Sequence, residues 1–174
     1  MNRELFLPTP EGEVRLLLLI DAFSDQQQGL EGRTKLAKLD FLLRYPAFLK
    51  RALEARGVIV TDESDDLFVE PNPIEQRMVR YRFGPWDPSY FSLLGSLVGR
   101  GLVTVVPYNR GIGYKTTAIG SDLASHMRAD PAWRPIDAST RLLRRHFNLA
   151  GSTLKNFVYQ HFPEVGSARW NEAL

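Results

Sequence analysis

The chain has 174 residues, 44% of them hydrophobic and 24% charged, which is enough apolar material for one ordinary globular core. It contains no cysteine, so disulfide frameworks, thiolate zinc sites and cysteine nucleophiles are excluded. The net charge is +2, with 17 arginines against 5 lysines, and guanidinium groups favour contacts with carboxylates, phosphates or partner proteins. The longest apolar run, residues 14–20, is too short to span a bilayer and lacks signal-peptide flanks, so we expect a cytoplasmic protein with no membrane association.

The first third of the chain is predicted to form an extended arm and three helices. The arm covers residues 1–12, and the helices cover 13–25, 33–45 and 47–56, with a break at Pro46. The second helix is expected to face inward with Leu36, Leu39, Leu42 and Leu43, and outward with Lys35, Lys38 and Arg44. Residues 61–73 are acidic and contain prolines, which indicates an exposed insertion.

Residues 77–120 carry the pattern that defines the predicted fold. Polar and apolar residues alternate over 77–83, as in a strand, and a Gly84–Pro85 turn follows. Asp87 suits a helix N-cap and Pro88 the first position of a helix over 89–99. The runs 102–107 and 112–120 predict a hairpin, with 77–83 as its third strand. A helix, a hairpin and then another helix is the layout of a winged-helix core.

The C-terminal part is predicted to be helical. Helices are expected at 121–128 and 137–147, Ser152 is expected to cap a last helix, and 163–174 are expected to be frayed. The predicted fold class is therefore α+β: a winged-helix core with a small antiparallel β-hairpin wing and a C-terminal helical extension. We divide the chain into a winged-helix domain, 1–130, with the acidic insertion at 61–73, and a helical extension, 131–174.

No group of residues in the sequence has the spacing of a catalytic or metal site. The three histidines, His126, His146 and His161, are not at metal-ligand spacing on one helix face. Gly111 and Gly113 lack the strand–loop–helix order and the lysine of a phosphate loop, so a hairpin turn is the simpler interpretation. The protein is expected to be non-enzymatic, without cofactor or metal.

Nucleic-acid binding and protein binding both remain open from the residues. A winged helix usually places the helix before the wing in the major groove, but here that helix offers Ser89, Ser92, Gly95, Ser96 and Gly99, with Arg100 as its one basic residue. This small-residue surface suits packing against another chain better than reading bases. The nucleic-acid-contact candidates are Arg100, Asn109, Arg110, Lys115, Arg141, Arg144 and Arg145.

The partner-interface candidates lie on the second and third helices and beside turns. They are Arg33, Lys35, Lys38, Arg44, Lys50, Arg51, Trp86 and Tyr108. Aromatic residues and arginine are enriched at interface hot spots, while core packing is the alternative interpretation for Trp86. The basic clusters could equally contact the DNA backbone or simply be solvated.

Three stretches together resemble a known family. Residues 32–46 read GRTKLAKLDFLLRYP, residues 81–86 read YRFGPW, and a leucine-rich helix leads into Gly101, Leu102 and Val103. These stretches resemble the middle components of ABC-three-component bacterial conflict systems, which include Lamassu-type anti-phage systems. The resemblance covers residues 13–125, and its most distinctive part is the second half of the first stretch.

The resemblance implies a small winged-helix subunit without catalytic activity. It implies two partners, an SMC-like ABC ATPase and an effector such as a nuclease, which the subunit bridges or restrains in a DNA-sensing complex. Non-specific contact with double-stranded DNA is possible in such an assembly. The alternative function is a stand-alone winged-helix transcriptional regulator that binds operator DNA through the wing and the helix before it.

Overall fold

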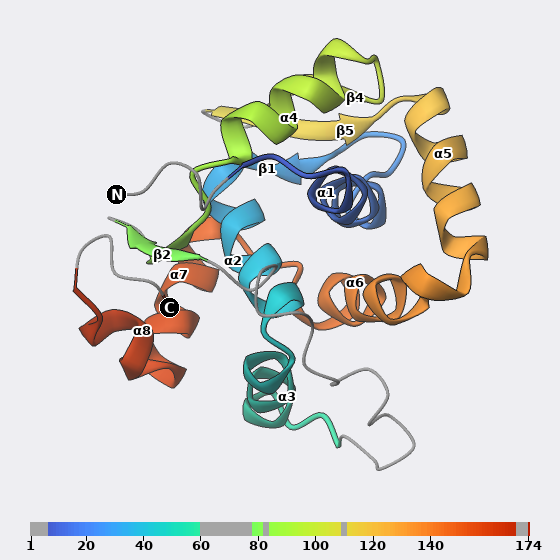
Figure 1. The fold of residues 1–174 in the computed structure, drawn as a ribbon. Helices are drawn as coiled ribbons and strands as arrows, with labels where there is room; N and C mark the ends of the chain where they lie inside the picture. Colours follow the sequence, from blue (N-terminus) through green and yellow to red (C-terminus); the bar gives the residue numbers. More distant parts are fainter. Residues whose placement is uncertain (1–6, 60–77, 82–83, 109–110, 170–173) are drawn as a thin grey trace.

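The protein is an α+β chain in which helices surround a small antiparallel sheet (Figure 1). Its computed structural model describes residues 7–59, 78–81, 84–108, 111–169 and 174. The predicted acidic insertion, 61–73, lies outside the described residues. No helix in the described ranges combines the length and apolar character needed to cross a membrane.

The elements alternate between helices and short strands. The helices are α1 Pro10–Ala22, α2 Gly32–Arg44, α3 Pro46–Ala55, α4 Tyr90–Gly99, α5 Ala118–Ala129, α6 Arg134–Phe147, α7 Gly151–His161 and α8 Pro163–Ser167, with a 3₁₀ turn at Pro131–Trp133. The strands are β1 Leu30–Glu31, β2 Val79–Tyr81, β3 Gly84–Trp86, β4 Val103–Tyr108 and β5 Gly111–Thr116.

Helix α1 begins three residues before the predicted start, inside the stretch expected to be an extended arm. Thr9 is its N-cap, and the Thr9 hydroxyl accepts a 3.0 Å hydrogen bond from the Gly12 N–H. Pro10 occupies the first helical position, where a missing N–H costs nothing. The extended-arm prediction is therefore wrong for residues 10–12, because a threonine cap and a proline start the helix there.

The predicted hairpin is present, but its third strand is a different one. Strands β4 and β5 pair with Val103 opposite Thr116 and Tyr108 opposite Gly111. The other edge of β5 is occupied by β1, where Leu30 pairs with Tyr114, so the sheet order is β1-β5-β4. Leu30 is fully buried, which anchors this edge.

The segment predicted as that third strand forms a separate two-stranded sheet. Strand β2 pairs with β3, with Val79 opposite Trp86 and Tyr81 opposite Gly84. Gly84 and Pro85, predicted as a turn, are thus in a strand. The prediction failed because β1 already fills the available edge of β5, and residues 79–81 pair with their nearest neighbours in the chain instead.

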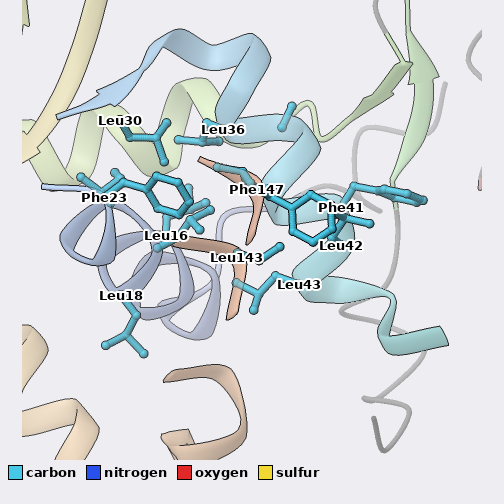
Figure 2. Close-up of a cluster of buried hydrophobic side chains, with 14 of the residues drawn as sticks. Leu16, Leu18, Phe23, Leu30, Leu36, Phe41, Leu42, Leu43, Leu143 and Phe147 are labelled. Atoms are coloured by element: carbon cyan, nitrogen blue, oxygen red, sulfur yellow. The ribbon is translucent and has the colours of Figure 1, made fainter. Parts of the chain in front are cut away.

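One hydrophobic core joins the N-terminal and C-terminal helices. Figure 2 shows Leu16, Leu36, Leu143 and Phe147, from α1, α2 and α6, gathered between these helices. Helices α7 and α8 add further buried side chains to the same core: Leu154, Val158 and Val165. The residues predicted to be frayed therefore include a docked helix, α8, because Val165 reaches the core.

Helix α5 is longer than predicted and connects the hairpin to α6 along one side of the molecule (Figure 1). It starts at Ala118, where Thr117 Oγ1 accepts a 3.1 Å hydrogen bond from the Gly120 N–H. The backbone of this first turn lies directly against Leu102, the residue before β4, since a Cβ at position 120 would lie 1.9 Å from the Leu102 carbonyl oxygen. Glycine is required for this close approach.

Candidate partner-binding surface and the polar cluster beneath it

A cluster of buried charged and polar side chains lies between α1, α2 and the start of α4. Arg15 Nε donates to Asp40 Oδ1 at 2.7 Å, and the Tyr90 hydroxyl donates to Asp40 Oδ2 at 2.7 Å. Arg44 Nη1 lies 3.6 Å from Asp40 Oδ2 and 2.5 Å from Asp87 Oδ2. Each carboxylate of this cluster therefore has a cationic partner, as buried charges require.

The cluster shifts the protonation of its members. Burial alone would raise the pKa of Asp40, but the Arg15 and Arg44 guanidiniums hold it below its ordinary value. Burial would lower the pKa of Arg44, but the acidic groups around it, Asp40 first and Asp87 with its hydrogen bond among the others, together raise it. The pKa of Tyr90 is raised by burial and then by the charge of Asp40. Asp40 stays ionised and Tyr90 stays neutral, so the hydrogen bond between them persists at neutral pH.

Asp87 also organises the first turn of α4. Its Oδ1 accepts hydrogen bonds from the Ser89 N–H at 2.7 Å and the Ser89 hydroxyl at 2.6 Å. The helix itself begins at Tyr90 with Ser89 at the N-cap position. The N-cap position is therefore Ser89, two residues after the predicted Asp87. The Asp87 carboxylate instead links the start of α4 to α2 through Arg44.

The prediction that Lys35, Lys38 and Arg44 face outward is wrong. All three are buried, because β3 and α7 pack on the side of α2 that carries them. Lys35 Nζ donates to Asn148 Oδ1 at 2.8 Å, and burial lowers its pKa. These three partner-interface candidates are thus buried within the chain, and Lys38 meets solvent only through a cavity that it lines.

Sequence reasoning missed this cluster although it left a signal. Asp40 and Arg15 are single charges inside otherwise apolar stretches, 39–43 and 14–20. A lone charge in an apolar stretch points to a buried ion pair, since an unpaired one is too costly to bury. Arg44 carried no such signal, because a cation at the end of an amphipathic helix is usually solvated.

The outward face of α4 carries small and apolar side chains. Phe91 is 62% exposed and Val98 is 38% exposed, with Ser92, Gly95 and Gly99 exposed between and beside them. We call these five residues the α4 face. Ser89, which was expected on this surface, is buried because it bonds to Asp87. Arg100, at the end of the helix, pairs with Glu13 at 2.7 Å.

An aromatic row continues from the α4 face onto the β2–β3 hairpin. The ring centroids of Trp86 and Phe91 lie 6.0 Å apart, and those of Tyr81 and Trp86 lie 5.7 Å apart. The Arg33 guanidinium lies 4.7 Å from the centroid of the Phe91 ring, a cation–π contact. These side chains border a cavity of about 400 Å³, which also reaches Lys38. Trp86 and Arg33 thus border the same cavity, and Trp86 is also partly buried against the hydrophobic core.

The remaining interface candidates lie apart from the α4 face. Arg51 pairs with Glu164 of α8 and lies over the rings of Phe48 and Phe162, so it fastens α8 to α3. Lys50 is half-buried on α3. Tyr108 is half-buried on β4 and borders a cleft with the N-terminal turn of α2.

The nucleic-acid candidates are largely engaged within the chain. Lys115 Nζ donates to the Gln26 carbonyl oxygen at 2.8 Å. Arg141 lies 2.5 Å from Asp137, and Arg144 lies 3.5 Å from Asp25. These two arginines and Arg145 line one cavity on α6. The other two candidates, Asn109 and Arg110, lie outside the described residues.

Among the described residues, no three histidine, aspartate or glutamate side chains gather as a metal-binding group. The His126 ring contacts the Asp122 carbonyl of its own helix, and the His161 ring lies 4.4 Å from that of Phe157. The α4 face and the aromatic row beside it are the candidate binding surface. Comparisons of the chain with protein-family models, with curated proteins and with solved structures found no match.

Proposed function

We propose that this chain is a cytoplasmic, non-catalytic accessory subunit with a winged-helix core, and that it binds a partner protein through the α4 face. By its resemblance, the partners are an SMC-like ABC ATPase and an effector such as a nuclease, which the subunit bridges. The resemblance to the middle components of three-component conflict systems supports the identity of the partners. The topology and the α4 face support the mode of binding.

The topology supports a winged-helix core. In chain order the core elements are α1, β1, α2, α4, β4 and β5, and the sheet order is β1-β5-β4. This is the arrangement in which a helix-turn-helix is followed by a hairpin wing, and the first short strand pairs with the returning strand of the wing. Helix α3 and residues 56–89 are then an insertion between the second and third helices of the core.

The composition of the α4 face is the main support for protein binding rather than base readout. Base readout needs arginine, lysine, asparagine or glutamine side chains directed into the groove. The α4 face has none of these, and Arg100, the basic residue next to it, is held by Glu13. Exposed apolar side chains flanked by glycines allow close approach of another protein surface instead.

A bridging subunit needs a second surface on the same rigid body. The hairpin supplies exposed apolar side chains, with Val105 at 46% and Ile112 at 45% exposure. Helix α6, which carries several arginines, lies on a different side of the molecule from α4 (Figure 1). We assign the α4 face to the ATPase and leave these two surfaces for the effector or for the DNA backbone.

Co-expression of the chain with the genes encoded beside it, followed by co-purification, tests whether it binds an SMC-like ATPase. Gly95→Glu and Val98→Glu place a charge in the centre of the α4 face, where no neighbouring atom lies within 4 Å of a Cβ at position 95. We expect both variants to fold and to lose the ATPase. Ile59→Glu is the matched control, because Ile59 is 88% exposed and lies far along the chain from α4.

Two outcomes would overturn the proposal. One is retention of the ATPase by both α4 variants. The other is tight binding of the isolated chain to one duplex sequence at physiological salt, abolished by Arg100→Glu, which would establish the transcriptional regulator. Weak binding to any duplex that declines steeply with salt is compatible with an accessory subunit.

A further inference from the structure

The cavity between α2, the β2–β3 hairpin and α4 adjoins the α4 face, with which it shares Phe91, but the proposed function assigns no ligand to it. Its volume is about 400 Å³, within the range of small-molecule sites. Its walls are mainly apolar and aromatic, and two cations, Arg33 and Lys38, border it. The described residues that line it include no aspartate or glutamate.

Lys38 is the polar group at the buried end of this cavity. The residue is 2% exposed, and none of the described residues accepts a hydrogen bond from its Nζ or pairs with it. Its Cε and Nζ pass 3.3 Å from the place where a Cβ would stand at Gly84, which has a φ of 104°. The missing side chain at position 84 therefore leaves the amine open to the cavity.

The surroundings of Lys38 are electropositive. Burial and, as the smaller cause, the nearby cation Lys155 together lower its pKa to about 7. A buried ammonium without a counter-charge is unfavourable, and an anion in the cavity would supply that charge. By contrast, the other buried cations of the described core, Arg15, Lys35 and Arg44, all have partners.

We propose that this cavity binds a small organic anion in which a carboxylate is joined to a flat apolar group. The carboxylate pairs with Lys38 Nζ, and the flat group lies against the aromatic wall that Trp86 and Phe91 form. A single buried amine matches a monoanion, whereas a phosphate dianion needs more donors than this buried end provides. The proposal rests on the cavity alone and does not depend on the partner-binding role of the α4 face.

Calorimetric titration of the full chain with 2-naphthoate tests the charge requirement. The neutral isostere 2-naphthamide has the same flat group, and we expect it to bind more weakly by about tenfold or more, as the loss of a charge-assisted hydrogen bond predicts. Lys38→Met should remove this preference and leave 2-naphthamide binding unchanged. Lys115→Met, at a lysine outside the cavity, is the matched control and should behave like the parent chain.

Two further readouts separate a binding role of Lys38 from a structural one. Above pH 7, binding of 2-naphthoate should take up a proton, visible as a binding enthalpy that depends on the buffer, because the anion favours the ammonium. Phe91→Ala removes an aromatic wall at an exposed position and should weaken naphthoate and naphthamide alike. An unchanged naphthoate preference in Lys38→Met would overturn the proposal, as would equal binding of acid and amide to the parent chain.

A peptide that ends in phenylalanine also carries a carboxylate next to a flat apolar ring, so it could bind the cavity in the same way. Titration with N-acetyl-glycyl-phenylalanine and with its amide distinguishes the two sources. If 2-naphthoate binds more tightly than the peptide acid, the ligand is a small molecule. If the peptide acid binds more tightly, the ligand is the C-terminus of a peptide, which would overturn the small-molecule assignment. Failure of both acids to bind would overturn the proposal, while the α4 variants would still test the accessory-subunit role.

Discussion

Arg44 Nη1 and Asp87 Oδ2 lie 2.5 Å apart across 43 positions of the chain, and both residues are buried. The pair fastens the C-terminal end of α2 to the segment that starts α4. Because Asp87 also accepts two hydrogen bonds from Ser89, the first turn of α4 is fixed to α2 by one carboxylate. The direction of the α4 face is therefore set by buried polar contacts as well as by apolar packing.

Asp87→Ala should destabilise the protein strongly. Removing the carboxylate takes away the 2.5 Å partner of the buried Arg44 guanidinium, and breaking one partner of a buried pair costs about 3–5 kcal/mol. Urea unfolding followed by circular dichroism gives the free energy of unfolding. The control is Glu13→Ala, which breaks the exposed pair with Arg100 and should cost less than about 1 kcal/mol. Equal losses in the two variants would contradict the buried role of Asp87.

Lys38 should make stability depend on pH on the alkaline side. Its pKa is about 7 in the folded chain against an ordinary value of 10.5, so between these values the unfolded chain binds a proton that the folded chain has released. The free energy of unfolding therefore rises with pH across this window. Lys38→Met should flatten the rise and raise the free energy of unfolding at pH 6 by about 2–5 kcal/mol. An unaltered pH profile in this variant would show that the amine titrates normally.

Gly120→Ala should be harmful although alanine favours helices. The new Cβ would meet the Leu102 carbonyl oxygen at 1.9 Å, which forces backbone movement and costs about 1–3 kcal/mol or more. Gly95→Ala is the matched change on α4, where nothing lies within 4 Å, and it should stabilise by about 0.4–1 kcal/mol. In thermal unfolding we expect Gly120→Ala to lower the melting temperature and Gly95→Ala to raise it.

Thr9→Ala should lower the stability of α1 by about 1 kcal/mol, because the Thr9 hydroxyl caps the Gly12 N–H. Ser152→Ala should change the free energy of unfolding by less than about 0.5 kcal/mol, since α7 is capped at Ala150 without a side-chain hydrogen bond. Both are read by chemical unfolding. A larger loss at Ser152 than at Thr9 would restore the capping role predicted from the sequence.

Elements that are determined by residues close together in the chain could be predicted from the sequence. Pro46 separates α2 from α3, and the β-branched run before Pro107 forms β4 of the hairpin, both as expected. Helix starts were predicted less well. The Thr9 and Thr117 caps were overlooked because Glu13 and Ser121, a few residues later, also begin plausible helical patterns.

The predictions that were wrong concern features that depend on contacts between segments far apart in the chain. Lys38 and Lys35 have the spacing of a solvated helix face, and only the packing of β3 and α7 against α2 buries them. The cavity could not be predicted for the same reason, since Lys38, Trp86 and Phe91 come from three separate elements. Strand β1 is two residues long, too short for any alternation to be visible before the fold is known.

The contact between Gly120 and Leu102 has a mechanical consequence. Helix α5 meets the backbone of Leu102, the residue before β4, without side chains between them, and Thr117 N–H adds a 3.0 Å hydrogen bond to the Leu102 carbonyl. At the other end of α5, Arg128 clamps Asp137 of α6 at 2.7 Å. Short contacts thus hold α5 at both ends, and we expect a displacement of the hairpin to shift α6 with it.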